Sequence, residues 1–306
     1  GRFPRLPWNA QASLKWRLEI TLIRQSPRIG YKLTTDWTGN GTRVAVRFRT
    51  PLRTDRGSFE VPFMVVDRTP STDEYFGFRS KYYAPAPETS DPVELRHWQT
   101  GLLKNTSGDM PTCRFVSISD KRHGVSLINS GNAGNFVCAG QVGFTVFRSP
   151  TALSYGVTSF DNVPVDGIIP DERKWEQGRM ETDFALVLHR GDWLDAGIPR
   201  QAQLFHHPLI VLSVRGPLKI QSASLLRVRP DSVIVSATGR SRDGRFNRVR
   251  CCEMAGRRTR LCLETPAARR AWLADMRERP LRRLKVREGV IEHTLGPHEI
   301  ATVIFE

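Results

Sequence analysis

Residues 14–20 of this chain read Leu-Lys-Trp-Arg-Leu-Glu-Ile, with an apolar side chain at every second position. Successive side chains of a strand point to opposite faces, so this alternation predicts a strand with one apolar and one polar face. The same signal recurs at 44–49, 59–63, 144–147, 184–188, 232–235 and 301–305. Turn-forming residues lie between these runs, as at 38–41 and 242–244. Many short strands separated by such turns predict an all-β protein of the sandwich class.

Helix signals are few, and the best one is the run at 265–273, which opens with a Thr-Pro pair suited to a helix start. An apolar strand is expected at 209–214, directly before a turn that contains the Gly-Pro pair at 216–217. We expect a domain boundary at this turn. The predicted organisation is a large β-sandwich over 1–218 and a small basic β-sandwich over 219–306.

Charge and composition limit the function classes. The chain has 306 residues, of which 39% are hydrophobic, so it has enough apolar material for a folded core. No apolar run approaches the roughly 18 residues of a membrane-spanning helix, and the N-terminus shows no apolar signal core. The five cysteines form no CxxC pair, which argues against a thiolate zinc site and favours a reducing compartment. These features predict a cytoplasmic protein with no membrane partner.

The formal charge of +15 raises nucleic acid as a partner, because clustered arginines are the electrostatic signature of nucleic-acid-binding proteins. The densest cluster consists of Arg245, Arg248, Arg250, Arg257, Arg258 and Arg260. Only Phe246 lies near it, whereas single-stranded nucleic acid is bound by several aromatic stacking platforms. The cluster therefore favours a solvated or domain-facing basic surface, and a basic nucleic-acid-binding β protein is the second alternative function.

A distinctive segment at 188–197 reads Leu-His-Arg-Gly-Asp-Trp-Leu-Asp-Ala-Gly. Further motifs accompany it along the chain, at 26–29, 35–37, 59–63, 123–130, 144–150, 205–209, 275–281 and 295–300. In this order, over roughly residues 14–306, the motifs resemble the C-terminal β domain of glycoside hydrolase family 38, the α-mannosidases.

The resemblance implies a large β-sandwich (a supersandwich of the galactose-mutarotase type) and a smaller β-sandwich, which follow a catalytic α/β barrel and a helical domain. In the family, the barrel carries the zinc ion with its two His and two Asp ligands, the nucleophilic Asp and the acid/base carboxylate. No stretch here matches those barrel motifs, so no catalytic residue and no cofactor is assigned to this chain. The resemblance also implies that 270–278 form a strand and its turn, and we prefer this to the helix signal because local propensity is a weak prior.

Four residues are candidates for a carbohydrate or interdomain contact, namely His189, Asp192, Trp193 and Trp175. His189 and Asp192 would supply polar contacts, and Trp193 would supply a stacking surface. The residue types alone favour a simpler interpretation, in which Asp192 caps a turn and Trp193 packs in the core. A metal site that joins His189 to the histidines at 206–207 is not expected, because adjacent residues on a strand point to opposite faces.

We expect the chain to buttress the catalytic barrel and helical domain of an α-mannosidase without carrying catalytic residues. The long acidic loop at 149–182 is expected to form one wall of the substrate cleft. The first alternative is a free-standing carbohydrate-binding module, with Trp98, Trp175 and the tyrosines at 82–83 as its exposed aromatics. Neighbouring carboxylates such as those at 171–172 suit a polar surface better than the paired carboxylates of a glycosidase.

Overall fold

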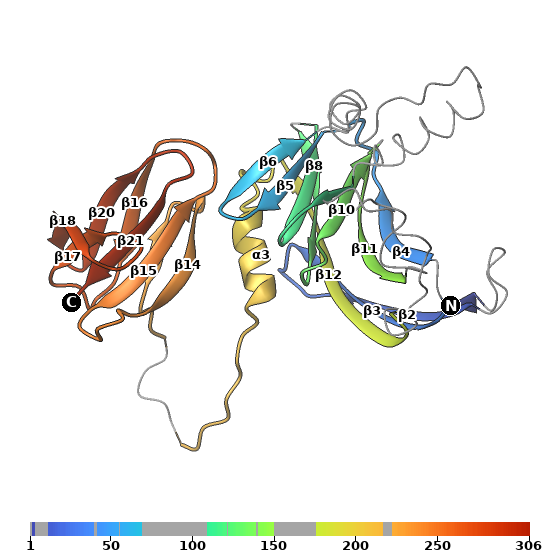
Figure 1. Cartoon of the computed structure of the whole chain (residues 1–306), viewed down its shortest axis with the longest axis horizontal. Coiled ribbons are helices and arrows are strands. Elements are labelled where there is room, and N and C mark those ends of the chain that lie inside the picture. Colours follow the sequence, from blue (N-terminus) through green and yellow to red (C-terminus); the bar gives the residue numbers. More distant parts are fainter. Residues whose placement is uncertain are drawn as a thin grey trace, which may run out of the picture. The chain divides into compact units, whose positions relative to one another are not determined.

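The computed structural model describes residues 2–3, 12–39, 42–54, 56–68, 109–120, 122–138, 140–149, 176–216 and 222–306. Strands dominate these residues, and α3 (Ile198–His206) is the one α-helix among them (Figure 1). The all-β class predicted from the sequence is therefore confirmed. The chain divides into two compact units, of which the first comprises 1–57 and 68–190 and the second comprises 58–67 and 191–306. The domain boundary expected after residue 218 stays a prediction.

The first unit is built on two antiparallel sheets. The larger sheet has the strand order β1 (Arg2–Phe3), β2 (Ser13–Leu22), β3 (Arg28–Thr38), β12 (Gly178–Arg190), β9 (His123–Asn129), β8 (Phe115–Ser119), β5 (Gly57–Val61) and β6 (Met64–Arg68). The smaller sheet has the order β4 (Thr42–Arg49), β11 (Gln141–Ser149), β10 (Gly134–Cys138) and β7 (Asp109–Pro111). Residues 58–67, which cover most of β5 and β6 and the turn between them, group with the second unit.

An aromatic core joins the two sheets of the first unit. Phe184, on β12 of the larger sheet, is fully buried and stacks on Tyr31 of β3 with ring centroids 4.9 Å apart. Phe144, on β11 of the smaller sheet, meets the same Phe184 ring edge-on at 5.1 Å. Such aromatic pairs add roughly 0.5–1.5 kcal/mol each beyond the area they bury. The alternation at 144–147 and 184–188 thus places its apolar faces toward a shared core, as expected for a sandwich.

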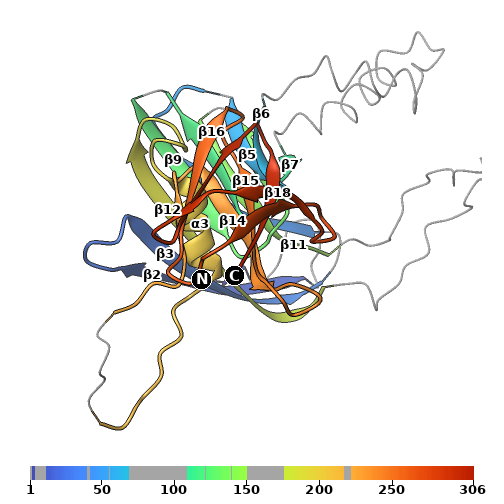
Figure 2. The same ribbon diagram turned by 90° about the vertical axis from the view of Figure 1, so that its left-hand side faces the viewer.

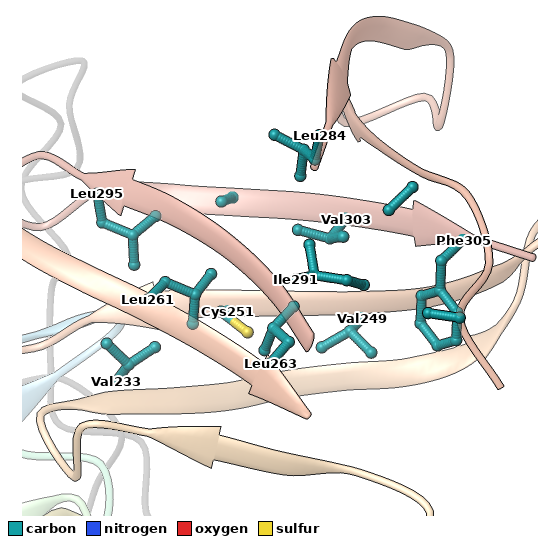
Figure 3. Close-up of a cluster of buried hydrophobic side chains, with 13 residues drawn as sticks. Val233, Val249, Cys251, Leu261, Leu263, Leu284, Ile291, Leu295, Val303 and Phe305 are labelled. Carbon is teal, nitrogen blue, oxygen red and sulfur yellow. The ribbon is translucent and has the colours of Figure 1, made fainter. Parts of the chain in front are cut away.

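The second unit contains a smaller sandwich. One sheet has the order β13 (Arg227–Arg229), β16 (Thr259–Glu264), β20 (Val290–Leu295) and β19 (Val286–Arg287). The other has the order β14 (Val233–Arg240), β15 (Asn247–Glu253), β21 (Ile300–Phe305), β17 (Ala271–Ala274) and β18 (Pro280–Leu284). The buried side chains that meet between them include Val249, Cys251, Leu261, Leu263, Ile291, Val303 and Phe305 (Figure 3).

The strand implied at 270–278 is confirmed. Residues 271–274 form β17, which pairs with β21 on one side and with β18 on the other. Ladder hydrogen bonds on both sides, together with burial of Ala271 and Ala274, outweigh the helix-start signal of the Thr-Pro pair. The run at 265–273 is therefore not a helix.

The expected strand at 209–214 is wrong. This segment has no regular structure, and its apolar side chains are exposed, with Leu209 at 92%. An apolar run becomes a strand only where a neighbouring strand supplies hydrogen-bond partners, and no described strand pairs with it.

The strand assumed at 206–207 is not present, because His206 is the last residue of α3 and His207 directly follows it. Ile198 and Ala202 lie one helical turn apart and form the buried side of α3, and Pro199 occupies the first turn, where it costs no hydrogen bond. His206 ends this helix, so the argument from opposite faces of a strand does not apply to the two histidines.

Candidate functional site

His189 is fixed within the larger sheet of the first unit. It lies on β12 opposite Gly124 of β9, and its ring covers that glycine. Its Nε2 lies 2.9 Å from the Oγ of Ser126, which also donates a hydrogen bond of 2.8 Å to the Oγ of Ser117. A Cβ on Gly124 would come within 2.1 Å of the ring, so the glycine is what leaves room for His189. These contacts hold the His189 ring against the sheet, and its carbohydrate or interdomain contact stays a prediction.

Asp192 and Trp193 lie in the second unit, in the turn that precedes α3. One carboxylate oxygen of Asp192 accepts the backbone N–H groups of Leu194 at 2.8 Å and Asp195 at 2.9 Å. This is the arrangement of an Asx turn, in which a side chain replaces a backbone acceptor. Trp193 is half-buried, and its carbonyl oxygen accepts the N–H of Ile198. The turn thus positions the start of the helix.

Several predicted residues lie outside the described part of the chain. These are Trp175, Trp98, the tyrosines at 82–83, the carboxylates at 171–172, and residues 150–175 of the expected cleft wall. The contact role of Trp175, and the carbohydrate-binding alternative that depends on these aromatics, stay predictions.

No metal-ligand set is present in the described residues, since no three His, Cys, Asp or Glu side chains gather closely enough to hold an ion. None of the described residues forms a helix with the length and apolar content that a membrane crossing requires. The adjacent thiols at 251–252 are buried, and burial raises the pKa of Cys251 to about 12 and that of Cys252 to about 11. Both thiols are therefore protonated at neutral pH and poor nucleophiles.

Part of the predicted arginine cluster serves the second unit itself. Arg248 pairs with Glu278, whose carboxylate also accepts the backbone N–H of Arg242 at 2.6 Å. That N–H, followed by the Arg248 guanidinium, lowers the pKa of Glu278 below its ordinary value. Arg250 donates to the Oγ1 of Thr302 at 3.1 Å. Arginines that are engaged in this way stabilise the sandwich and are less available to a nucleic acid.

The sequence pattern predicts an apolar face on β2 but not that this face is exposed, and we call this surface the β2 apolar face. It consists of Trp16, Leu18, Ile20 and Leu22, which are 40%, 38%, 61% and 75% exposed. Ile20 lies opposite Tyr31 of β3, and Tyr31 lies opposite Phe184 of β12, so the strand pairing places these three side chains on one face of the sheet. The three strands β2, β3 and β12 lie side by side in Figure 2. Exposure rises along this row from the buried Phe184 to Ile20, because the core covers Leu14 at the start of β2 but does not extend over Ile20.

The opposite face of the same strands is polar. Arg17 pairs with Glu19 at 3.3 Å, and Lys32 pairs with Glu181 at 2.9 Å. The outer edge of β2 is paired with β1 only at residues 14–15, so no described strand borders residues 16–22 on that side. An open edge beside an apolar face is a surface on which another polypeptide can pack.

Comparison with known families agrees with this architecture. Residues 7–173, more than half of the chain, match the model of the glycosyl hydrolases family 38 C-terminal domain. Residues 232–303 match the model of the glycosyl hydrolases family 38 C-terminal beta sandwich domain.

Individual relatives are considerably longer than this chain. Alpha-mannosidase 2C1 from Mus musculus is 23% identical over 230 residues, which are 72% of this chain and 20% of that protein. The Homo sapiens alpha-mannosidase 2C1 is 24% identical over 224 residues, again 20% of its length. The chain thus spans about a fifth of these curated relatives.

Solved structures share the fold. A glycosyl hydrolase family 38 protein from Enterococcus faecalis superimposes with a TM-score of 0.71 over 96% of this chain and 30% of its own, at 18% identity. An alpha-mannosidase from Enterococcus faecalis V583 gives a TM-score of 0.70, with 29% of its chain covered. The ordered motifs, the two sandwiches and the family models agree, and the chain belongs to glycosyl hydrolase family 38, as its C-terminal β region.

Proposed function

We propose that this chain is the non-catalytic C-terminal β region of an α-mannosidase, in which it supports the catalytic part and shapes one wall of the substrate cleft. The family resemblance implies a zinc ion for the catalytic part. The described residues do not fit that group, because they bring no three ligating side chains together. We therefore infer that this chain acts through the contacts that its surface makes with the catalytic part and the substrate.

The observation that carries the proposal is the β2 apolar face. Ile20 and Leu22 expose more than half of their side chains on the same side of the sheet as the core. Fully burying such a side chain stabilises a protein by roughly 1.5–3 kcal/mol, so leaving both uncovered forgoes a large part of that energy. An apolar row continuous with a core is better explained by a covering partner than by contact with water.

Chain length supports a covering partner within the same enzyme. The curated relatives and the similar solved structures are more than three times longer than the segment that this chain matches. In such an arrangement the catalytic part would pack on the β2 apolar face, while the polar face, with its ion pairs, would stay in water.

The test compares two adjacent positions of β2 in the intact enzyme. Ile20→Asp places a charge on the apolar face, whereas Thr21→Asp places the same charge on the polar face. We expect Ile20→Asp to lower the temperature at which mannosidase activity is lost, and Thr21→Asp to leave it nearly unchanged. The melting temperature of the isolated chain should change little with either variant, because both side chains are already exposed. Equal behaviour of the two variants in the intact enzyme would count against the proposed interface.

A further inference from the structure

A basic groove of about 750 Å³ lies in the second unit, and no part of the proposed function uses it. Five cations and one carboxylate line it, namely Arg258, Arg260, Arg282, Arg283, Lys285 and Glu292. Arg260 and Glu292 come from β16 and β20 of one sheet, whereas Arg282 and Arg283 come from β18 at the edge of the other (Figure 1). The groove therefore gathers positive charge from both sheets of the sandwich.

The charges in the groove do not balance. Arg260 donates to both carboxylate oxygens of Glu292 at 2.8 Å, so the one acidic side chain among the described lining residues is already paired. Arg258, Arg283 and Lys285 have no ion-pair partner within the described residues. Like charges that line one groove repel one another, and an anion that binds there relieves the repulsion.

One of the cations is held in position. The Nη2 of Arg282 lies 3.3 Å from the Nδ1 of His293, whose side chain is only 9% exposed. A guanidinium can only donate, so Nδ1 of His293 accepts, and the buried ring restrains the exposed arginine. Restraint of this kind lowers the entropy that the arginine loses on binding a ligand.

The residue types select the ligand class. Guanidinium groups match phosphate oxygens in a bidentate geometry, and a lysine adds a point charge. The volume falls within the range of small-molecule sites. Among the described residues no Phe, Tyr or Trp lines the groove, so it lacks the large stacking platforms of a site for single-stranded nucleic acid.

We propose that this groove binds inorganic phosphate or the phosphate group of a small phosphate monoester, with Arg258, Arg282 and Lys285 as its ligands. The proposal does not depend on the interface at β2 or on the catalytic role of the family. The phosphate could be inorganic or carried by a sugar, and the two sources differ in whether groups beyond the phosphate add affinity.

The experiment is calorimetric titration of the purified chain at low ionic strength with inorganic phosphate, mannose 6-phosphate and mannose. We expect both phosphates to bind, mannose not to bind, and the affinity of the phosphates to fall as salt is added. Tighter binding of mannose 6-phosphate than of inorganic phosphate would assign a sugar phosphate, and equal binding would assign phosphate alone.

Two pairs of substitutions test the location. Arg258→Gln with Lys285→Gln removes two groove cations that have no ion-pair partner in the described protein, so the fold should persist. Arg277→Gln with Arg287→Gln removes two exposed cations outside the groove and is the matched control. We expect the first pair to weaken phosphate binding roughly tenfold or more and the control pair to change it little.

Three results would overturn the proposal. The first is no measurable binding of either phosphate, and the second is an equal loss of affinity in both pairs of variants, which would indicate diffuse charge. The third is a DNA oligonucleotide that binds more tightly than mannose 6-phosphate and displaces it, which would indicate a polyanion surface. Arg282→Gln, measured alone with its melting curve, provides an independent check if the groove pair does not fold.

Discussion

Substituting Gly124 by alanine tests whether His189 is a structural residue of the sheet. The new Cβ would lie 2.1 Å from Cε1 of the His189 ring, far inside van der Waals contact, so the ring must move. Because His189 is half-exposed, the ring can swing toward solvent, and the minimum cost is its hydrogen bond to Ser126, about 1 kcal/mol. If the ring stays, overpacking costs up to about 3 kcal/mol. We therefore expect Gly124→Ala to destabilise the first unit by about 1–3 kcal/mol.

The assay is a double-mutant cycle measured by urea unfolding of the isolated chain. In a His189→Ala background the clash is gone, so Gly124→Ala should cost much less there than in the wild-type chain. The coupling between the two positions should then account for most of the single-variant effect. An equal loss of unfolding free energy in both backgrounds would refute this account of His189. It would show that Gly124→Ala destabilises the chain through a clash with something other than the His189 ring.

Two further predictions concern the second unit. Because the pKa of Glu278 is lowered by folding, the stability that it contributes is present above about pH 4.5 and is lost as the pH falls through the lowered pKa. Glu278→Gln should thus flatten the decline in stability on the acid side, and an unchanged acid-unfolding curve would contradict the ion pair. Cys251 and Cys252 should resist iodoacetamide in the folded chain at neutral pH, whereas the exposed Cys113 should react, as mass spectrometry of the labelled chain would show.

Alternation of apolar and polar residues predicts strands well but not what covers them. The pattern at 14–20 correctly predicts β2 and its two faces, because side-chain direction is set by the backbone alone. Exposure of the β2 apolar face depends on how far the smaller sheet extends, which is a property of tertiary packing. The apolar run at 209–214 shows the same limit, since a strand requires a partner that local sequence does not supply.

Local propensity and tertiary pairing compete in the segment that follows residue 264. The Thr-Pro pair before 267 is good helix-start chemistry, but the segment that follows pairs with β21 near the end of the chain. Helix α3 has few buried positions, so its apolar periodicity is too short to stand out from the surrounding loops.

The candidate site shows why motifs indicate families more readily than contacts. The segment 188–197 helped to identify the family, yet the hydrogen-bond partner of His189 is 63 residues away and is reached only through strand pairing. The basic groove likewise joins Arg258 and Arg260 of the predicted cluster to Arg282 and Arg283 from the other sheet. In both arrangements the residues that meet are far apart in the sequence, so local motifs do not predict that they meet.

The central claim is that this chain belongs to an α-mannosidase but does not itself carry the catalytic residues. The most direct measurement is hydrolysis of a chromogenic α-mannoside by the purified chain, with and without added Zn²⁺. We predict no hydrolysis above the buffer blank in either condition. Zinc-dependent hydrolysis that co-purifies with the chain would contradict the claim, because it would require a complete catalytic site within these 306 residues.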